Sequence, residues 1–189
     1  RLFVPERGEI LLDGVNIKDI TLDEWRKNIG YVSQEIFLKN ATIEENVKFY
    51  QASITDGEMH EAARMANIYD VIAGYSQGFK TIVGERGVFL SAGQRQRIVL
   101  ARVLARRPKI LILDEATSAL DNESEQMIRK AIENLKREVT VLVIAHRLST
   151  IMNCDRLLVI NEGRIQEEGA PEELLKDTQS YFHKVHAIG

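Results

Sequence analysis

The sequence predicts an α/β fold with a mainly parallel sheet. Apolar runs such as Ile110–Leu113 and Val139–Ala145 are typical of buried strands and are far too short to span a membrane. They alternate with segments of helical periodicity, which is the order of elements in a parallel sheet packed with helices. The 189 residues are 44% apolar and 28% charged, which excludes a disordered or fibrous chain. We therefore expect a sheet covered by helices on both faces.

The charge balance argues against a nucleic-acid or lipid-binding protein. Lys and Arg number 25 and Asp and Glu 28, so the net charge is −3. One expected helix is basic from Arg95 to Lys109, but such a run is usually a solvated helix face, and no aromatic residues interleave it. The single cysteine, Cys154, excludes an internal disulfide and favours a reducing compartment. We expect a soluble, cytosol-facing chain without a nucleic-acid partner.

The N-terminal half is expected to hold two strands and several capped helices. Arg1–Phe3 has the character of a helix end that Pro5 and Gly8 terminate, so the chain is interpreted as a fragment of a longer protein. Ser/Thr-x-x-Glu spacing predicts helix starts at Thr21, Thr42 and Thr55. The other expected elements are a strand at 9–12 before the Asp13–Gly14 turn, a strand at 29–32 and one amphipathic helix over 58–73.

The C-terminal half alternates more regularly. Ser91 and Gln94 have the spacing of a capping pair at the start of a further helix. The elements expected after it are a strand at 110–113, a helix at 122–136, a strand at 140–144, a short helix at 148–152, strands at 156–160 and 164–168, and a helix opened by Pro171.

Two carboxylates follow the most apolar strand. Asp114 and Glu115 come directly after Ile110–Leu113, which places them at the carboxyl edge of the sheet, where open α/β folds bind ligands. One carboxylate there can hold Mg²⁺ while the other polarises an attacking water. Four apolar residues followed by two acids also arise by chance, so this motif alone is weak.

The segment Leu90–Gln94 is more specific. It places the Ser91 hydroxyl, the Gly93 backbone N–H and the Gln94 amide at a helix N-terminus, where unpaired N–H groups and the helix dipole favour an anion. The alternative is that Ser91 and Gln94 only cap the helix. Capping explains those two residues but not the glycine beside them.

Three further polar residues lie where elements end or begin. His146 follows the strand at 140–144, although a lone histidine is more often structural. Gln34 follows the strand at 29–32 and by itself is an ordinary loop residue. Asp121 is by default the N-cap of the helix at 122–136.

Together and in this order, these motifs resemble the nucleotide-binding domain of an ABC transporter over essentially the whole chain. Three segments, Thr81–Gly87, Glu115–Asp121 and Ala145–Thr150, resemble the exporters of that family. The matches are Gln34 to the Q-loop, Leu90–Gln94 to the signature, Ile110–Asp114 to the Walker B strand, Glu115 to the catalytic glutamate, Ser118–Asp121 to the D-loop and His146 to the switch histidine.

The resemblance implies a P-loop NTPase (RecA-like) core over 1–34 and 109–189, with an inserted α-helical subdomain over 35–108. It implies ATP and Mg²⁺, a head-to-tail dimer with a second nucleotide-binding domain, and a transmembrane domain fused upstream, at the cytoplasmic face of a membrane. The implied site residues are Glu115 and His146 for catalysis, Asp114 and Gln34 for the metal, and Ser91, Gly93, Gln94, Gln34 and Asp121 for ATP.

The sequence departs from the family at two places. No Gly-x-x-x-x-Gly-Lys-Ser/Thr loop occurs in it, so we expect these 189 residues on their own neither to bind ATP tightly nor to hydrolyse it. Ala92 stands where the signature normally has glycine, and we expect a modest effect because Ser91 and Gly93 remain as donors.

Two other functions stay open from the sequence. One is an ABC ATPase that acts on DNA or ribosomes, although the span from Gln34 to Ser91 leaves no room for a coiled-coil insertion. The other is a non-catalytic module that lends its signature to a complete partner.

Overall fold

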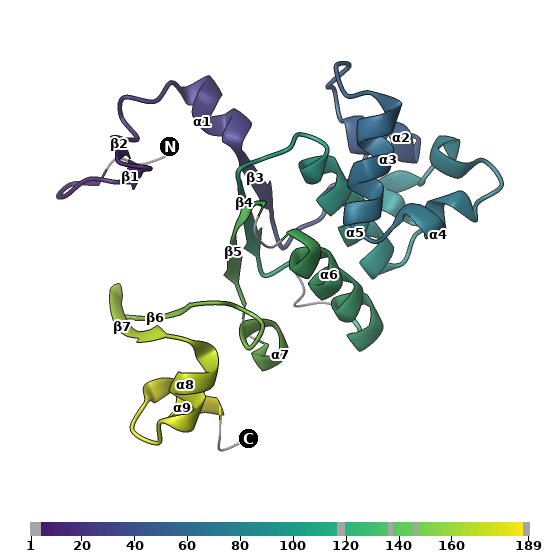
Figure 1. The fold of residues 1–189 in the computed structure, drawn as a ribbon. Coiled ribbons are helices and arrows are strands. Elements are labelled where there is room, and N and C mark those ends of the chain that lie inside the picture. The colour runs from purple at the N-terminus through teal and green to yellow at the C-terminus, as the bar shows by residue number, and fades with distance from the viewer. Residues whose placement is uncertain (1–4, 117–119, 136–137, 146, 187–189) are drawn as a thin grey trace. The chain divides into compact units, whose positions relative to one another are not determined.

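The chain divides into two compact units, Arg1–Ile144 and Ala145–Gly189, in a computed structural model that describes residues 5–116, 120–135, 138–145 and 147–186 (Figure 1). The first unit contains β1 (Leu11–Leu12), β2 (Val15–Asn16), α1 (Leu22–Asn28), β3 (Ile29–Val32), α2 (Ile43–Lys48), α3 (Asp56–Met65), α4 (Tyr69–Ala73), the 3₁₀ helices η1 (Gly78–Lys80) and η2 (Glu85–Gly87), α5 (Ala92–Leu104), β4 (Ile110–Asp114), α6 (Asn122–Leu135) and β5 (Thr140–Ile144). The second contains α7 (Leu148–Ile151), β6 (Leu157–Asn161), β7 (Arg164–Gly169), α8 (Pro171–Lys176) and α9 (Tyr181–His186). None of the described helices combines the length and apolar character needed to cross a bilayer.

A parallel sheet in the order β3-β4-β5 forms the centre of the first unit. The register places Tyr31 opposite Ile112 and Asp114 opposite Ile144. This confirms the predicted α/β class, and it brings the carboxyl ends of strands that are far apart in sequence to one edge.

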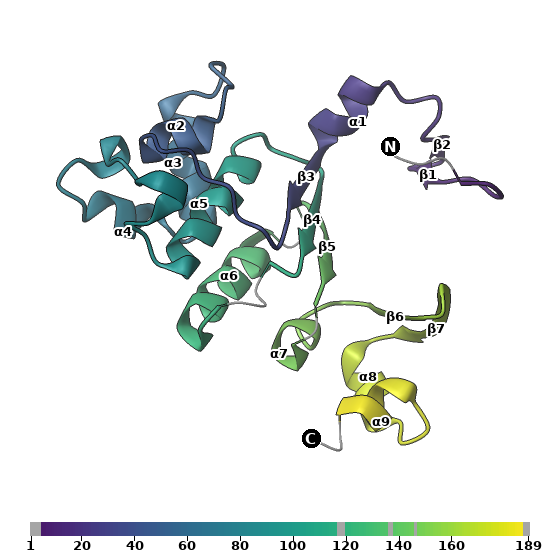
Figure 2. The same ribbon diagram turned by 180° about the vertical axis from the view of Figure 1, so that it is seen from behind.

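Helices cover one face of this sheet. Val32, Leu111 and Leu113 are buried, and both views place α5 and α6 on the same side of β3, β4 and β5 (Figures 1 and 2). On the other face Tyr31, Leu142 and Ile144 are 53%, 50% and 46% exposed. No described segment of this unit buries these side chains, so the cover expected on this second face stays a prediction.

The approach of α5 to the sheet depends on a glycine. A Cβ at Gly30 in β3 would lie 2.3 Å from Val103 Cγ1 and 3.0 Å from Pro108 Cγ. Real side chains do not approach so closely, so only glycine lets the helix pack directly on the strand.

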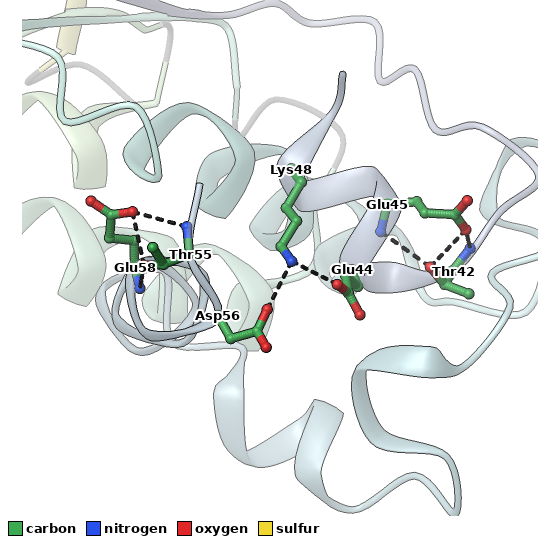
Figure 3. Close-up of polar contacts among 7 residues, drawn as sticks. All are labelled: Thr42, Glu44, Glu45, Lys48, Thr55, Asp56 and Glu58. Carbon is green, nitrogen blue, oxygen red and sulfur yellow. Dashed lines mark hydrogen bonds and ion pairs between the residues drawn. The ribbon is translucent and has the colours of Figure 1, made fainter. Parts of the chain in front are cut away.

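Capping boxes set the starts of four helices in the first unit. The hydroxyls of Thr21, Thr42, Thr55 and Ser91 accept hydrogen bonds from the backbone N–H three residues on, at 3.3, 3.1, 3.2 and 3.2 Å. In each case the Glu or Gln at that third position accepts in return from the cap backbone (Figure 3 shows the Thr42 and Thr55 boxes). The helix starts predicted from this spacing are confirmed.

Lys48 joins two of these helices. Its Nζ lies 2.7 Å from a Glu44 oxygen in α2 and 2.7 Å from a carboxylate oxygen of Asp56 in the first turn of α3 (Figure 3). The hydrogen bond to Asp56, followed by that to Glu44, raises the pKa of Lys48 above its ordinary value. The ammonium therefore stays charged and ties the end of α2 to the start of α3.

One predicted helix is in fact two. The helix expected over 58–73 divides into α3 and α4, because Asn67 between them has a φ of 52° in the left-handed region. A residue in that conformation ends a helix, and asparagine tolerates it better than most residues. The Asn67 side chain then donates to the Met127 carbonyl in α6 at 2.9 Å.

The second unit is built on an antiparallel hairpin. β6 pairs with β7 across a turn in which Glu162 and Gly163 have φ of 49° and 75°. The two successive strands predicted at 156–160 and 164–168 are confirmed, and they pair directly with each other. Pro171 opens α8 as expected, whereas α9 was not predicted.

Glu167 in β7 anchors α9 to the hairpin. Its carboxylate accepts from the backbone N–H groups of Tyr181 at 2.5 Å and Phe182 at 3.0 Å, and from the Ser180 hydroxyl at 2.9 Å. The bond from the Tyr181 backbone, the largest cause, lowers the pKa of Glu167 below its ordinary 4.5. Its contribution to stability is therefore present above about pH 4.5 and is lost as the pH falls through the folded-state pKa.

We expect Glu167→Gln to speed hydrogen exchange of the α9 amides at pH 7, because the amide loses the charge-assisted bonds. The difference from the parent should shrink as the pH falls below about 4.5 and through the folded-state pKa of Glu167, because protonation then removes the charge from the parent side chain as well. Glu162→Gln, in the hairpin turn, is the control and should leave α9 exchange unchanged. Equal exchange in Glu167→Gln and the parent at pH 7 would contradict the anchoring role.

Candidate functional site

Asp114 is held in place by a tyrosine from the neighbouring strand. The Tyr31 hydroxyl in β3 donates to Asp114 Oδ2 at 2.7 Å, across 83 positions of sequence. This hydrogen bond to the carboxylate, followed by desolvation, raises the pKa of Tyr31, so the phenol stays protonated and remains a donor. Sequence reasoning missed Tyr31. Its position near the end of a predicted strand could have indicated a residue at the sheet edge. Its contact with Asp114 could not be predicted, because the pairing of the two strands was unknown.

Glu115 leaves the strand in a left-handed conformation. Its backbone N–H donates to the Ile144 carbonyl at 3.0 Å, and its φ is 48°. The backbone therefore stays attached to β5 while the chain turns sharply away from β4. This turn directs the segment that carries Glu115 into a cleft beside the sheet edge.

The cleft brings Gln34 and Glu115 together. It has a volume of about 550 Å³, and its lining residues come from the segment after β3, from η2, from the start of α5 and from the segment after β4. They are Gln34, Ile36, Glu85, Arg86, Val88, Ala92, Arg95, Gln96, Glu115, Ala116 and Leu120. Two residues predicted separately from the sequence thus share one concave site.

Gln96 provides a polar group in the wall of this cleft that sequence reasoning also missed. Gln96 is only 3% exposed, and its side-chain Nε2 has no hydrogen-bond partner among the described residues. A buried amide without a partner is costly, so this donor suits a site that a polar group enters.

The start of α5 carries Ser91 as its N-cap, followed by Gly93 and Gln94 in the first turn. Ser91 is exposed and Gln94 half-buried, and the two side chains cap the helix reciprocally. The predicted capping is therefore confirmed. This first turn has no acidic side chain, which leaves the helix dipole favourable for an anion near exposed Ser91.

Asp121 caps α6 through both of its oxygens. Oδ1 accepts from the Ser124 N–H at 2.9 Å and Oδ2 from the Ser124 hydroxyl at 2.8 Å. The backbone bond, followed by the hydroxyl bond, lowers the pKa of Asp121. The default expectation of an N-cap is confirmed. Ser118 in the same motif and the predicted His146 lie outside the described residues.

Comparisons with known proteins agree with these motifs. Residues 1–118 match the ABC transporter family. The chain is 45% identical over 185 residues to ABC transporter B family member 1 of Dictyostelium discoideum and 46% identical over 189 residues to ATP-binding cassette sub-family B member 5 of Mus musculus. These alignments cover 98% and 99% of this chain but 20% and 15% of the relatives.

Two bacterial proteins are also similar to this chain. A putative multidrug export ATP-binding/permease protein of Staphylococcus aureus is 47% identical over 97% of this chain and 32% of its own length. The solved structure of a bacterial Atm1-family ABC exporter with ATP bound matches with a TM-score of 0.88 and 39% identity, over 100% of this chain and 33% of that one. The chain thus spans about a third or less of these relatives, and it belongs to the ABC transporter family.

Proposed function

We propose that this chain is part of the nucleotide-binding domain of an ABC exporter and couples ATP hydrolysis to transmembrane transport. The observation that carries the proposal is the cleft shared by Gln34 and Glu115 at the end of β4. In this proposal, 1–34 and 109–189 form the ATPase core and 35–108 the helical subdomain. A transmembrane domain is fused upstream, and the site faces the cytoplasm.

The described residues fit a magnesium ion that is shared with a nucleotide. They contain no group of three or more His, Cys, Asp or Glu side chains arranged to hold a metal by themselves. Mg²⁺ is typically bound by one or two carboxylates together with substrate phosphates and water. Asp114, which Tyr31 orients through one oxygen, and Gln34 would supply protein oxygens. When bound, the ion would neutralise charge on the phosphates.

Glu115 would orient and polarise the attacking water, because a carboxylate at the cleft can accept a hydrogen bond and then a proton from it. His146 would contact the γ-phosphate. The sequence lacks a phosphate-cradling loop, so we also propose that these 189 residues on their own neither bind ATP tightly nor hydrolyse it.

The signature residues would act on a second site. Ser91, Gly93 and Gln94 would donate hydrogen bonds toward the nucleotide bound by an opposite domain, with Asp121 at the same interface. Exposed Ser91 at the first turn of α5 supports this role, because it can be reached from outside the chain. Closing the dimer and completing the site would then be one event.

A mixed-dimer experiment tests this arrangement in the full-length protein. Glu115→Gln and Ser91→Arg chains with different tags are co-assembled, and mixed dimers are purified through both tags. Each homodimer should be nearly inactive, whereas the mixed dimer should regain about half of the parent ATP turnover, because one of its two sites then combines an intact Glu115 with an intact Ser91.

The control is Thr55→Arg, which removes an equivalent exposed capping hydroxyl at α3, away from the proposed site. It should keep parent turnover in either chain. A mixed dimer as inactive as the two homodimers would show that both residues serve the same chain's site, contrary to the proposal.

A further inference from the structure

The first turns of α5 and α6 lie in close contact at Gly93 and Ser124. A Cβ built on Gly93 would lie 2.1 Å from Ser124 Oγ and 2.4 Å from Ser124 Cβ. No real Cβ approaches that closely, and Gly93 has ordinary helical backbone, so glycine is needed here for space. Capping did not explain why a glycine stands at position 93, and this contact with Ser124 explains it without a bound ligand.

Ser124 also holds Asp121. Its N–H and its hydroxyl donate to the two Asp121 oxygens at 2.9 and 2.8 Å, while its side chain is buried against α5. An N-cap needs only the backbone bond. The hydroxyl adds a second bond that fixes the orientation of the carboxylate, so a shift of Asp121 must displace Ser124 against Gly93.

A chain of hydrogen bonds closes the same junction from the other side. Arg97 Nε donates to the Gly93 carbonyl at 3.3 Å, and its Nη1 donates to the Asn67 carbonyl at 2.6 Å. The Asn67 side chain donates in turn to the Met127 carbonyl in α6 at 2.9 Å. The start of α5, the loop before α4 and the first half of α6 are therefore connected at two places.

We propose that Ser124 is a positioning residue that holds Asp121 and the Leu90–Gln94 segment in one fixed arrangement. The inference rests on the proposed function, in which both motifs face the second nucleotide-binding domain. With Ser124 in place, the two motifs meet that domain as one surface. Without it, each has to be ordered separately when the dimer closes.

A compensating pair of substitutions tests the contact in the full-length protein. Gly93→Ala should lower ATP turnover by at least about tenfold, since its methyl group collides with Ser124. Ser124→Gly should lower it several-fold by removing the hydroxyl. The double variant should return to the level of Ser124→Gly, because the colliding atoms are gone and Ser124 Cα would lie 3.5 Å from the new Cβ.

Gln126→Gly is the matched control, since it places the same helix-weakening residue at an exposed position of α6. It should keep turnover near that of the parent. A double variant as slow as Gly93→Ala, or slower, would mean that Gly93 acts only on a nucleotide, and the proposal would be overturned.

A distance measurement separates this proposal from the ATPase itself. Spin labels at Glu61→Cys in α3, which packs on α5, and Gln126→Cys in α6 are placed in one protomer of a cysteine-free full-length dimer whose other protomer carries no label. Pulsed electron–electron double resonance should give one narrow distribution of distances between the two labels, and this distribution should be the same with and without MgATP. Ser124→Ala should broaden the distribution. A distance that changes with MgATP in the parent would refute a fixed arrangement. Because this readout needs no turnover, an inactive protein with the narrow distance would count against the proposed ATPase and not against Ser124.

Discussion

Glu115→Gln in the full-length protein is expected to lower ATP turnover by about 10²- to 10⁴-fold, the usual range for loss of a general base. The amide keeps the size of the side chain in the cleft but cannot accept a proton from water. ATP binding should persist, because the substitution removes a negative charge beside the phosphates and no phosphate-binding group. Phosphate release measures the turnover, and nucleotide retained by the purified dimer measures the binding.

Glu133→Gln is the matched control, with the same change of charge at an exposed position of α6. Its turnover should stay close to that of the parent. Unchanged turnover in Glu115→Gln would remove this carboxylate from the mechanism, and loss of ATP binding together with turnover would assign it a binding role.

Arg102→Met is expected to lower the free energy of unfolding by about 3 kcal/mol, the upper range for loss of a hydrogen-bonded charged group. Arg102 is buried, and its guanidinium donates to the carbonyls of Asn46 at 2.7 Å and Phe37 at 2.9 Å. It also lies 4.2 Å from the centre of the Phe49 ring. Burial, with a smaller effect of Arg106, lowers the pKa of Arg102 to about 10, so it remains charged at neutral pH. Methionine fills similar space but leaves the buried Asn46 carbonyl and the part-buried Phe37 carbonyl without this donor.

Urea unfolding followed by circular dichroism measures this effect, and Arg106→Met is the control. Arg106 is exposed, so its substitution should change stability by less than about 0.5 kcal/mol. A loss below about 1 kcal/mol for Arg102→Met would show that water replaces the guanidinium, contrary to the buried geometry. Because Phe37 follows Gln34 closely, the same variant should also loosen that wall of the cleft.

Local interactions were readable from the sequence. The capping boxes at Thr42, Thr55 and Ser91 join residues three positions apart, so spacing alone predicts them. The parallel sheet also follows from short apolar runs that alternate with helices. Asn67 marks the limit of this approach, because apolar periodicity continues across it although its backbone conformation ends α3.

Contacts between distant segments were not readable. The Tyr31–Asp114 bond depends on the β3–β4 register, and the Gly93–Ser124 contact depends on how closely two helices approach. Gln34 and Glu115 were predicted separately as site residues from the sequence, and only the fold shows that they line one cleft. Ser124 resembled an ordinary helix residue until its neighbours in space were known.

The left-handed backbone at Glu115 sets the stability of the fold against ATP turnover. A side chain with a Cβ costs about 1–2 kcal/mol in that region compared with glycine, which adopts it freely. Selection for a more heat-resistant variant would therefore favour glycine at this position, whereas selection for turnover would retain the carboxylate. Laboratory evolution under thermal pressure alone would drift toward loss of activity at this residue, and thermostabilised variants of this protein need turnover as a second selected trait.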